Sequence, residues 1–247
     1  MARYKVILAY DGTGFSGFQR QANARTVQAE VERVLRKLGW RGRSLAAAGR
    51  TDSGVHALGQ VVAFDLDWQH SPADLLNAMN TRLPSDVAVR SIEIAGSDFH
   101  PRFSALSRIY RYSLFCDPVH QPVRERFSWR VWPPVQASGL ESAARLILGE
   151  HDFRSFGRAP REESGTIRLV KNAEWRQRGD EYLFEIEANA FLYRMVRRLV
   201  AVQVKISQGD LDLGAMYSYL HEPRKRPIQG LAPPHGLMLY KVIYDDQ

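Results

Sequence analysis

The sequence contains a single cysteine, Cys116, so the chain cannot form an internal disulfide or a zinc site built from several cysteines. It also lacks an apolar run close to the roughly 20 residues that cross a bilayer. The longest candidate, residues 191–206, is interrupted by four basic residues: Arg194, Arg197, Arg198 and Lys205. The N-terminal residues lack the long apolar stretch of a signal peptide. We therefore expect a cytoplasmic protein without a membrane segment.

Acidic residues are in short supply. Asp and Glu number 27 against 34 for Lys and Arg, which gives a net charge of +7 and a pI of about 9.7. Such a surplus suits a polyanionic partner such as RNA, DNA or a membrane surface, although some proteins are basic without one. Hydrophobic residues make up 45% of the 247 positions, which is enough for one large core or two ordinary ones.

Hydrophobic periodicity predicts an α+β protein with antiparallel sheets. In the first half, a strand, a helix capped by Thr26, two strands, a helix and a strand are expected at residues 4–10, 27–38, 44–48, 61–68, 72–83 and 87–94. This order is the split βαβ pattern of a ferredoxin-like half. The second half repeats the theme more loosely, with strands at 107–116, 170–178, 182–188 and 237–244 and helices at 137–148, 191–206 and 211–220. We expect domains at 1–105 and 106–247.

A glycine-rich loop follows the first strand. Gly12, Gly14 and Gly17 match the pattern G-x-G-x-x-G, but the next helix is expected only at Thr26. A dinucleotide site needs the helix to begin at the glycines, so we interpret the segment as a tight loop and expect no nucleotide cofactor. Phe18 and Gln19 add a flat ring and an amide to it. They suit RNA contact, whereas simple packing is the alternative.

Asp52 lies in the segment Gly49-Arg50-Thr51-Asp52-Ser53-Gly54-Val55-His56-Ala57. A strand-ending turn is the simpler interpretation, because Asp, Ser and Gly are common turn residues. However, Arg50 stands two residues earlier and points the same way on extended backbone. A carboxylate held by a guanidinium stays ionised, as a nucleophile must. His56 could be a base or a metal ligand, but without a second ligand nearby a histidine making a loop hydrogen bond is favoured.

Charge alternates with aromatic rings at the start of the second half. Arg108, Tyr110 and Tyr112 share one face of the expected strand. A base can stack on a tyrosine while arginines hold phosphates, and a half-buried edge strand is the alternative. We favour RNA contact because the whole chain is basic.

The expected helix at residues 191–206 carries two kinds of arginine. Arg194, Arg198 and Lys205 form a basic stripe, and we expect them to neutralise phosphates together with Arg224, Lys225 and Arg226. Arg197 instead falls within a second apolar strip, opposite the stripe that faces the core. An arginine there meets a buried carboxylate or lines a site.

Several segments together resemble the TruA family of tRNA pseudouridine synthases. They occur in family order over essentially the whole chain: Tyr10-Asp11-Gly12-Thr13, Phe15-Ser16-Gly17-Phe18-Gln19-Arg20-Gln21, residues 49–57, Arg102-Phe103-Ser104-Ala105, Tyr110-Arg111-Tyr112, His151-Asp152-Phe153, Ser155-Phe156, Ala190-Phe191-Leu192, Met195-Val196-Arg197, Ala232-Pro233 and Gly236-Leu237. The segments around Ala201 and Gln229 depart from the family's usual residues.

The resemblance implies two ferredoxin-like halves flanking a basic catalytic cleft, a homodimer, no cofactor and no metal. It implies an isomerase that converts uridine to pseudouridine at positions 38 to 40 of the tRNA anticodon stem-loop. By motif, Asp52 is similar to the family nucleophile, Tyr110 to the residue against the target base, and Arg197 to the partner of Asp52.

Two other functions fit the same residues. A tRNA-binding module or chaperone without catalysis would explain the charge and the aromatic rings, but it would leave Asp52, Arg50 and Arg197 without a role. A carboxylate-dependent hydrolase acting on RNA or a nucleoside would need a second acid or a metal. Whether Asp52 attacks the sugar, attacks the base or removes a proton stays open, as does the choice between stacking and proton transfer for Tyr110.

Overall fold

The computed structural model describes residues 1–159, 165–224 and 226–245. The described chain is α+β, with five α-helices and mostly antiparallel strands. It forms two compact units: unit 1 comprises residues 1–106 and 238–247, and unit 2 comprises residues 107–237. These units describe packing, and the expected boundary of independently folding domains near residue 105 stays a prediction.

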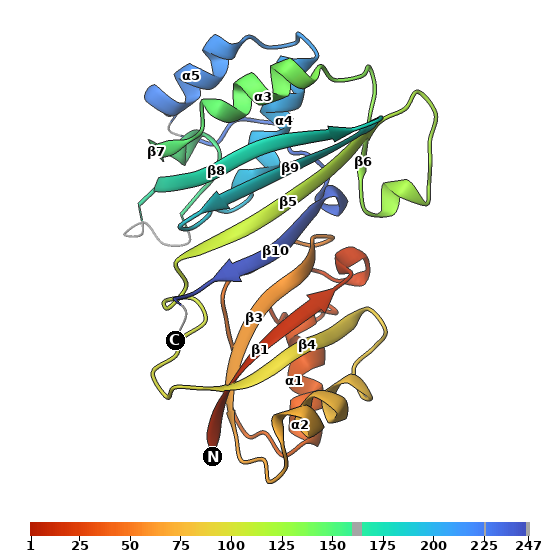
Figure 1. Cartoon of the computed structure of the whole chain (residues 1–247), viewed down its shortest axis with the longest axis vertical. Helices are drawn as coiled ribbons and strands as arrows, with labels where there is room; N and C mark the ends of the chain where they lie inside the picture. Colours follow the sequence, from red (N-terminus) through yellow and green to blue (C-terminus); the bar gives the residue numbers. More distant parts are fainter. Residues whose placement is uncertain (160–164, 225, 246–247) are drawn as a thin grey trace. The chain divides into compact units, whose positions relative to one another are not determined.

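Unit 1 is a sheet with two helices. Its elements are β1 (Ala2–Tyr10), α1 (Val27–Lys37), β2 (Ala46–Ala47), β3 (His56–Leu66), α2 (Pro72–Asn80), β4 (Val87–Ala95) and most of β10 (Leu237–Ile243). The strands lie in the order β4-β1-β3-β10 (Figure 1), and β2 pairs with β3. β1 is antiparallel to both β3 and β4, whereas β10 runs parallel to β3. The expected order of strand, helix, two strands, helix and strand is confirmed.

Local chemistry explains these elements. β1 alternates between half-buried and buried residues, which places Val6, Leu8 and Tyr10 in the core on one face. α2 begins at a capping box in which Ser71 and Asp74 bond each other's backbone N–H, with Pro72 as the first helical residue. α2 packs along β4.

One expectation for unit 1 was wrong in its bounds, and another, Thr26 as the N-cap residue, was confirmed in position. β3 begins at His56, five residues earlier than expected, so His56 belongs to a strand. Hydrophobic periodicity did not predict this first part of β3, because β3 is buried on both faces and lacks the alternation that marks a half-buried strand. Thr26 does precede α1, but its side chain makes no capping bond.

Among its described residues, unit 2 contains five strands with helices packed on them. Its elements are β5 (Ser107–Cys116), β6 (Trp129–Val131), α3 (Ala137–Arg145), β7 (Gly149–Asp152), β8 (Ile167–Arg178), β9 (Glu181–Ala188), α4 (Met195–Ser207) and α5 (Leu213–His221). Short 3₁₀ turns lie at Arg124–Arg126, Phe153–Ser155 and Pro234–Gly236, and unit 1 has one at Gly12–Gly14. The antiparallel order is β5-β9-β8-β7, and β6 pairs parallel to β5. α3 packs on β8 and against α4 and α5 (Figure 1).

The helix expected at residues 191–206 begins four residues later, at Met195. Arg194 just before it has a left-handed backbone with φ of 62°, and Tyr193 pairs with Arg158 in an isolated bridge. The chain before α4 is therefore held in a non-helical path by a partner remote in sequence, which periodicity cannot reveal. The short strands β6 and β7 were also not predicted.

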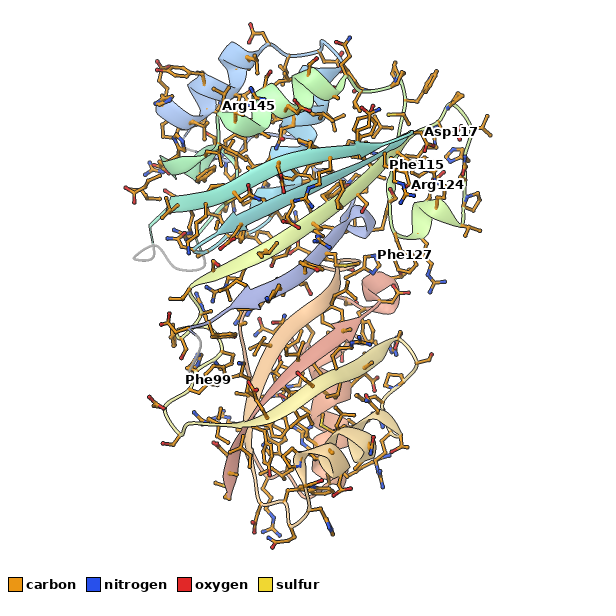
Figure 2. All side chains as sticks on the ribbon, in the orientation of Figure 1. Phe99, Phe115, Asp117, Arg124, Phe127 and Arg145 are labelled. Atoms are coloured by element: carbon orange, nitrogen blue, oxygen red, sulfur yellow. The ribbon has the colours of Figure 1, made fainter. Side chains whose placement is uncertain are left out.

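Arg124 links β5 to the turn between β8 and β9 in unit 2. The Arg124 guanidinium lies 4.0 Å from the centre of the Phe115 ring (Figure 2). It also pairs with Asp180, in the turn between β8 and β9, at 2.7 Å. Separately, across the described part of the chain, no helix has both the length and the hydropathy to cross a membrane.

Candidate functional site

The Asp52 loop, residues 49–55, connects β2 to β3 in unit 1. Thr51 is buried, Asp52 is half-buried and Ser53 is exposed. The backbone N–H of Phe18 donates to the Thr51 carbonyl at 3.0 Å, and the N–H of Val55 donates to the Asp52 carbonyl at 3.1 Å. The carboxylate of Asp52 thus stands on a turn whose backbone is bonded on both sides of it.

The glycine-rich loop packs directly against the Asp52 loop. A Cβ at Gly12 would lie 2.1 Å from the carbonyl oxygen of Val55, and Gly17 has φ of +91° with the Thr51 carbonyl 2.9 Å from its ideal Cβ position. Both positions need glycine, because any side chain would separate the loops. The glycines therefore serve close packing, and α1 begins ten residues beyond Gly17, as the rejection of a dinucleotide site anticipated.

His56 takes part in the same packing. Its side chain is 2% exposed, and the backbone N–H of Gly12 donates to its Nδ1 at 3.0 Å. The hydrogen bond favoured by the simpler interpretation is present. Among the described residues, no three His, Cys, Asp or Glu side chains gather as metal ligands would.

Arg50 is exposed, and within the described part of the chain no ion pair joins it to Asp52. The extended-backbone argument placed the two side chains on one side, but it could not predict contact. A catalytic role for Arg50 stays a prediction.

Phe18 does not present its ring to solvent. It is 2% exposed, and its ring lies 6.3 Å from that of Tyr10. The expectation that Phe18 offers a surface to RNA is corrected by this burial, since a loop between two packed segments uses its rings for the core. Gln19, the next residue, is exposed and keeps its predicted role as an RNA contact.

The β5 face that carries Arg108, Tyr110 and Tyr112 is divided. Arg108 and Tyr110 are half-buried; Arg108 donates to the Asn189 carbonyl at 2.9 Å, and the Tyr110 ring meets Phe191 edge-on at 4.9 Å. Tyr112 is 0% exposed and burial raises its pKa well above the ordinary value. Only the first two side chains are therefore placed to meet a ligand.

Tyr112 and Arg197 hold the same segment of unit 2. The Tyr112 hydroxyl donates to the Pro233 carbonyl at 2.9 Å. Arg197, half-buried near the start of α4, donates from Nε to the Ala232 carbonyl at 2.7 Å, while the N–H of Ala232 donates back to the Arg197 carbonyl at 3.1 Å. This reciprocal pair fixes the guanidinium plane. The sequence did not reveal that Tyr112 holds this segment, because its partner Pro233 lies far along the chain.

Arg198 has a structural environment. Its guanidinium donates to the carbonyls of Ile228, Phe156 and Tyr193 at 3.1, 3.2 and 3.4 Å. Burial first, and then the neighbouring Arg194, lower the pKa of Arg198. Its donors join three loops, which argues against the expected phosphate contact. Arg194 is exposed and its guanidinium lies 4.7 Å from the centre of the Tyr193 ring.

An open pocket of about 620 Å³ lies along α4 and α5 in unit 2. It contains three of the expected phosphate-binding residues, Lys205, Arg224 and Arg226, and none of its ten lining residues is acidic: Ala201, Val202, Lys205, Leu211, Tyr219, Arg224, Arg226, Pro227, Ile228 and Gln229. Of the other three residues expected to bind phosphate, Arg194 and Arg198 do not line this pocket, and Lys225 lies outside the described residues. The pocket has the charge that a phosphate group requires.

Comparison with known proteins relates these features to one family. A family model described as tRNA pseudouridine synthase matches residues 6–104 and 143–245. This chain belongs to the tRNA pseudouridine synthase family. Both matched segments lie within described secondary structure for most of their length, and the first contains the glycine-rich loop and the Asp52 loop.

Named relatives match this chain over essentially its full length. A protein named tRNA pseudouridine synthase A from Geobacillus kaustophilus is 39% identical over 249 residues, covering 99% of this chain and 95% of its own. Proteins of the same name from Streptococcus equi subsp. equi and Pseudothermotoga lettingae are 36% and 38% identical, covering 100% and 98% of this chain and 100% and 99% of their own. A chain in the crystal structure of a Cbf5-Nop10-Gar1 complex is 13% identical with a TM-score of 0.39, covering 81% of this chain and 44% of that one.

Proposed function

We propose that this chain isomerises uridine to pseudouridine in the anticodon stem-loop of tRNA, at positions 38 to 40. Membership of the tRNA pseudouridine synthase family supports the reaction. The observation that carries the site is Asp52, a half-buried carboxylate on a turn fixed by two backbone hydrogen bonds. The turn packs against a glycine-rich loop in which Gly12 and Gly17 leave no room for a side chain.

The reaction breaks the N1–C1′ bond, turns the base and joins C5 to C1′. The C5 hydrogen leaves as a proton and N1 gains one, so the change is redox-neutral and consumes no water. The target base must leave its stack to be reached. In the proposal, Asp52 supplies the carboxylate near the sugar or base, whether it attacks either one or takes a proton.

The roles in unit 2 follow from the resemblance. Tyr110 lies against the target base, by stacking or by moving the C5 proton, and its half-buried ring beside Phe191 supports that role. Arg197 acts with Asp52 on the same nucleotide, supported by the fixed plane of its guanidinium. The other roles come from the residues themselves: Arg50 in unit 1 assists Asp52, Arg108 and Arg194 in unit 2 hold RNA phosphates, and Gln19 in unit 1 contacts the RNA.

Finer features of the fold and assembly are part of the same proposal. The strand and helix order of unit 1 supports a ferredoxin-like half, and unit 2 is proposed as the second, the two flanking a basic catalytic cleft. The family resemblance supports a homodimer, and a tRNA substrate supports work in the cytoplasm.

The proposal is tested by incubating the pure protein with an unmodified tRNA transcript in EDTA. We expect release of the C5 hydrogen together with pseudouridine at positions 38 to 40, and no release when those uridines are replaced by cytidines. A binding protein would release none, and a hydrolase would give free base or RNA fragments. Either of those outcomes, or isomerisation confined to other positions, contradicts the proposal.

A further inference from the structure

A buried polar network lies behind the Asp52 loop, and the reaction as described does not use it. Tyr10, the last residue of β1, is 5% exposed, and its hydroxyl lies 2.8 Å from Oγ1 of Thr51, the residue before Asp52. Gln60, in the middle of β3, is 0% exposed and donates from Nε2 to the Gly49 carbonyl at 3.0 Å. The two side chains thus reach the loop at both ends of the three residues that precede Asp52.

The strand register shows how Tyr10 reaches this place. β1 pairs with β3 as Leu8 opposite Gln60 and then as Tyr10 opposite Ala57, so the register shifts by one residue between them. An irregularity of this kind re-aims a side chain at a sheet edge. Beyond the shift, the Tyr10 hydroxyl meets Thr51, while the backbone pairing of β2 with β3 extends to Ala48 and ends where Gln60 binds Gly49.

The chemistry of the network suits a fixed hydrogen bond. Burial raises the pKa of Tyr10 to about 12, against the opposing effect of Thr51 and Gln60, so the phenol stays protonated through the neutral range.

We propose that Tyr10 and Gln60 are positioning residues for Asp52, holding the Gly49–Thr51 backbone so that the carboxylate is fixed before RNA binds. The proposal rests on the proposed function of Asp52. Neither side chain needs to touch the RNA, so their loss affects the chemical step and leaves tRNA binding intact.

The test compares Tyr10→Phe with Tyr4→Phe. Tyr4 is on the same face of β1 and 3% exposed, but it packs on Phe64, away from the loop, so its variant controls for loss of a buried hydroxyl. Single-turnover rates at saturating enzyme, tRNA Kd and Tm are measured. We expect Tyr10→Phe to slow isomerisation about 10-fold with an unchanged Kd, since a displaced catalytic group loses rate steeply, and Tyr4→Phe to keep the wild-type rate.

Conservative variants of the partner separate positioning from bulk stability. Thr51→Ser keeps the hydroxyl and should retain most of the rate, whereas Thr51→Val removes it and should match Tyr10→Phe. The double variant Tyr10→Phe/Thr51→Val should be no slower than either single variant, because each substitution alone already removes the one hydrogen bond between the two side chains. Gln60→Met should slow turnover without weakening tRNA binding.

Asp52→Asn, assayed alongside, separates a failure of the positioning proposal from a failure of the proposed function. If Asp52→Asn is inactive while Tyr10→Phe keeps the wild-type rate, or loses no more than Tyr4→Phe, the positioning proposal is overturned and the proposed function stands. If Asp52→Asn still isomerises uridine at an appreciable rate, Asp52 is not the catalytic group and positioning falls with it.

Discussion

Gly12→Ala probes the packing that holds the Asp52 loop. The new Cβ would lie 2.1 Å from the Val55 carbonyl oxygen and 2.5 Å from its carbon. Ordinary contact begins near 3.4 Å, so the two loops must separate by about 3.4 − 2.1 = 1.3 Å. Because the contact is with backbone, no side-chain rotation relieves it. The hydrogen bond from Gly12 N–H to His56 must stretch with the loop.

The expected magnitude follows from that displacement. Overpacking of this kind costs about 1–3 kcal/mol of stability, and a shift near 1 Å in a catalytic group can cost about 100-fold in rate. The assay is single-turnover formation of pseudouridine at saturating enzyme, with Tm measured on the same samples. We expect a folded protein with a lower Tm and a rate reduced 10- to 100-fold by these estimates.

Gly14→Ala is the matched control, since it adds the same methyl to the same glycine pattern. Its Cβ would meet only the ends of two side chains, Arg25 at 3.2 Å and its ion-pair partner Asp86 at 3.7 Å, and these can shift by a few tenths of an ångström. Tm should stay near that of the wild type. A wild-type rate and Tm for Gly12→Ala would refute the packing argument, as would equal losses in both variants.

Four further outcomes are expected. tRNA affinity should fall steeply with salt, by about 0.7–0.9 in the log–log slope for each phosphate contact, and an affinity independent of salt would rule out the basic surface. Tyr110→Phe should bind tRNA normally but lose about 10²–10⁴-fold in rate if its hydroxyl moves the C5 proton, whereas stacking alone predicts little loss. His56→Gln should be mild by comparison, and the reverse pattern would make His56 the proton carrier. Arg198→Gln should lower Tm while leaving the salt slope of tRNA binding unchanged, because its donors bind three carbonyls; an unchanged Tm with a smaller slope would restore it as a phosphate contact.

Elements with strong local signals were predictable from the sequence. β5 matches its expected bounds at Ser107–Cys116, and β8 ends at Arg178, as expected of the strand at residues 170–178. Arg197 stood out as an arginine in an apolar strip, and the structure places it half-buried with its Nε bonded to a carbonyl. Each of these signals lies within a few residues of the feature that it predicts.

Features that depend on remote partners could not be predicted. The sequence left RNA contact and packing open for Phe18, and the packing of its loop on residues 49–55 buries the ring. Arg198 was placed on a basic stripe, but carbonyls from residues 156, 193 and 228 decide its role. The same limit hid Tyr10, whose partner Thr51 is 41 residues away.

The central claim is that Asp52 carries the isomerisation of uridine, and Asp52→Asn tests it most directly. The substitution keeps the shape of the side chain and removes its charge, while the turn is held by backbone bonds that it leaves intact. In single-turnover assays with unmodified tRNA, we expect wild-type Kd and Tm, no release of the C5 hydrogen and no pseudouridine. Appreciable isomerisation by this variant, in a preparation free of other synthases, would contradict the claim.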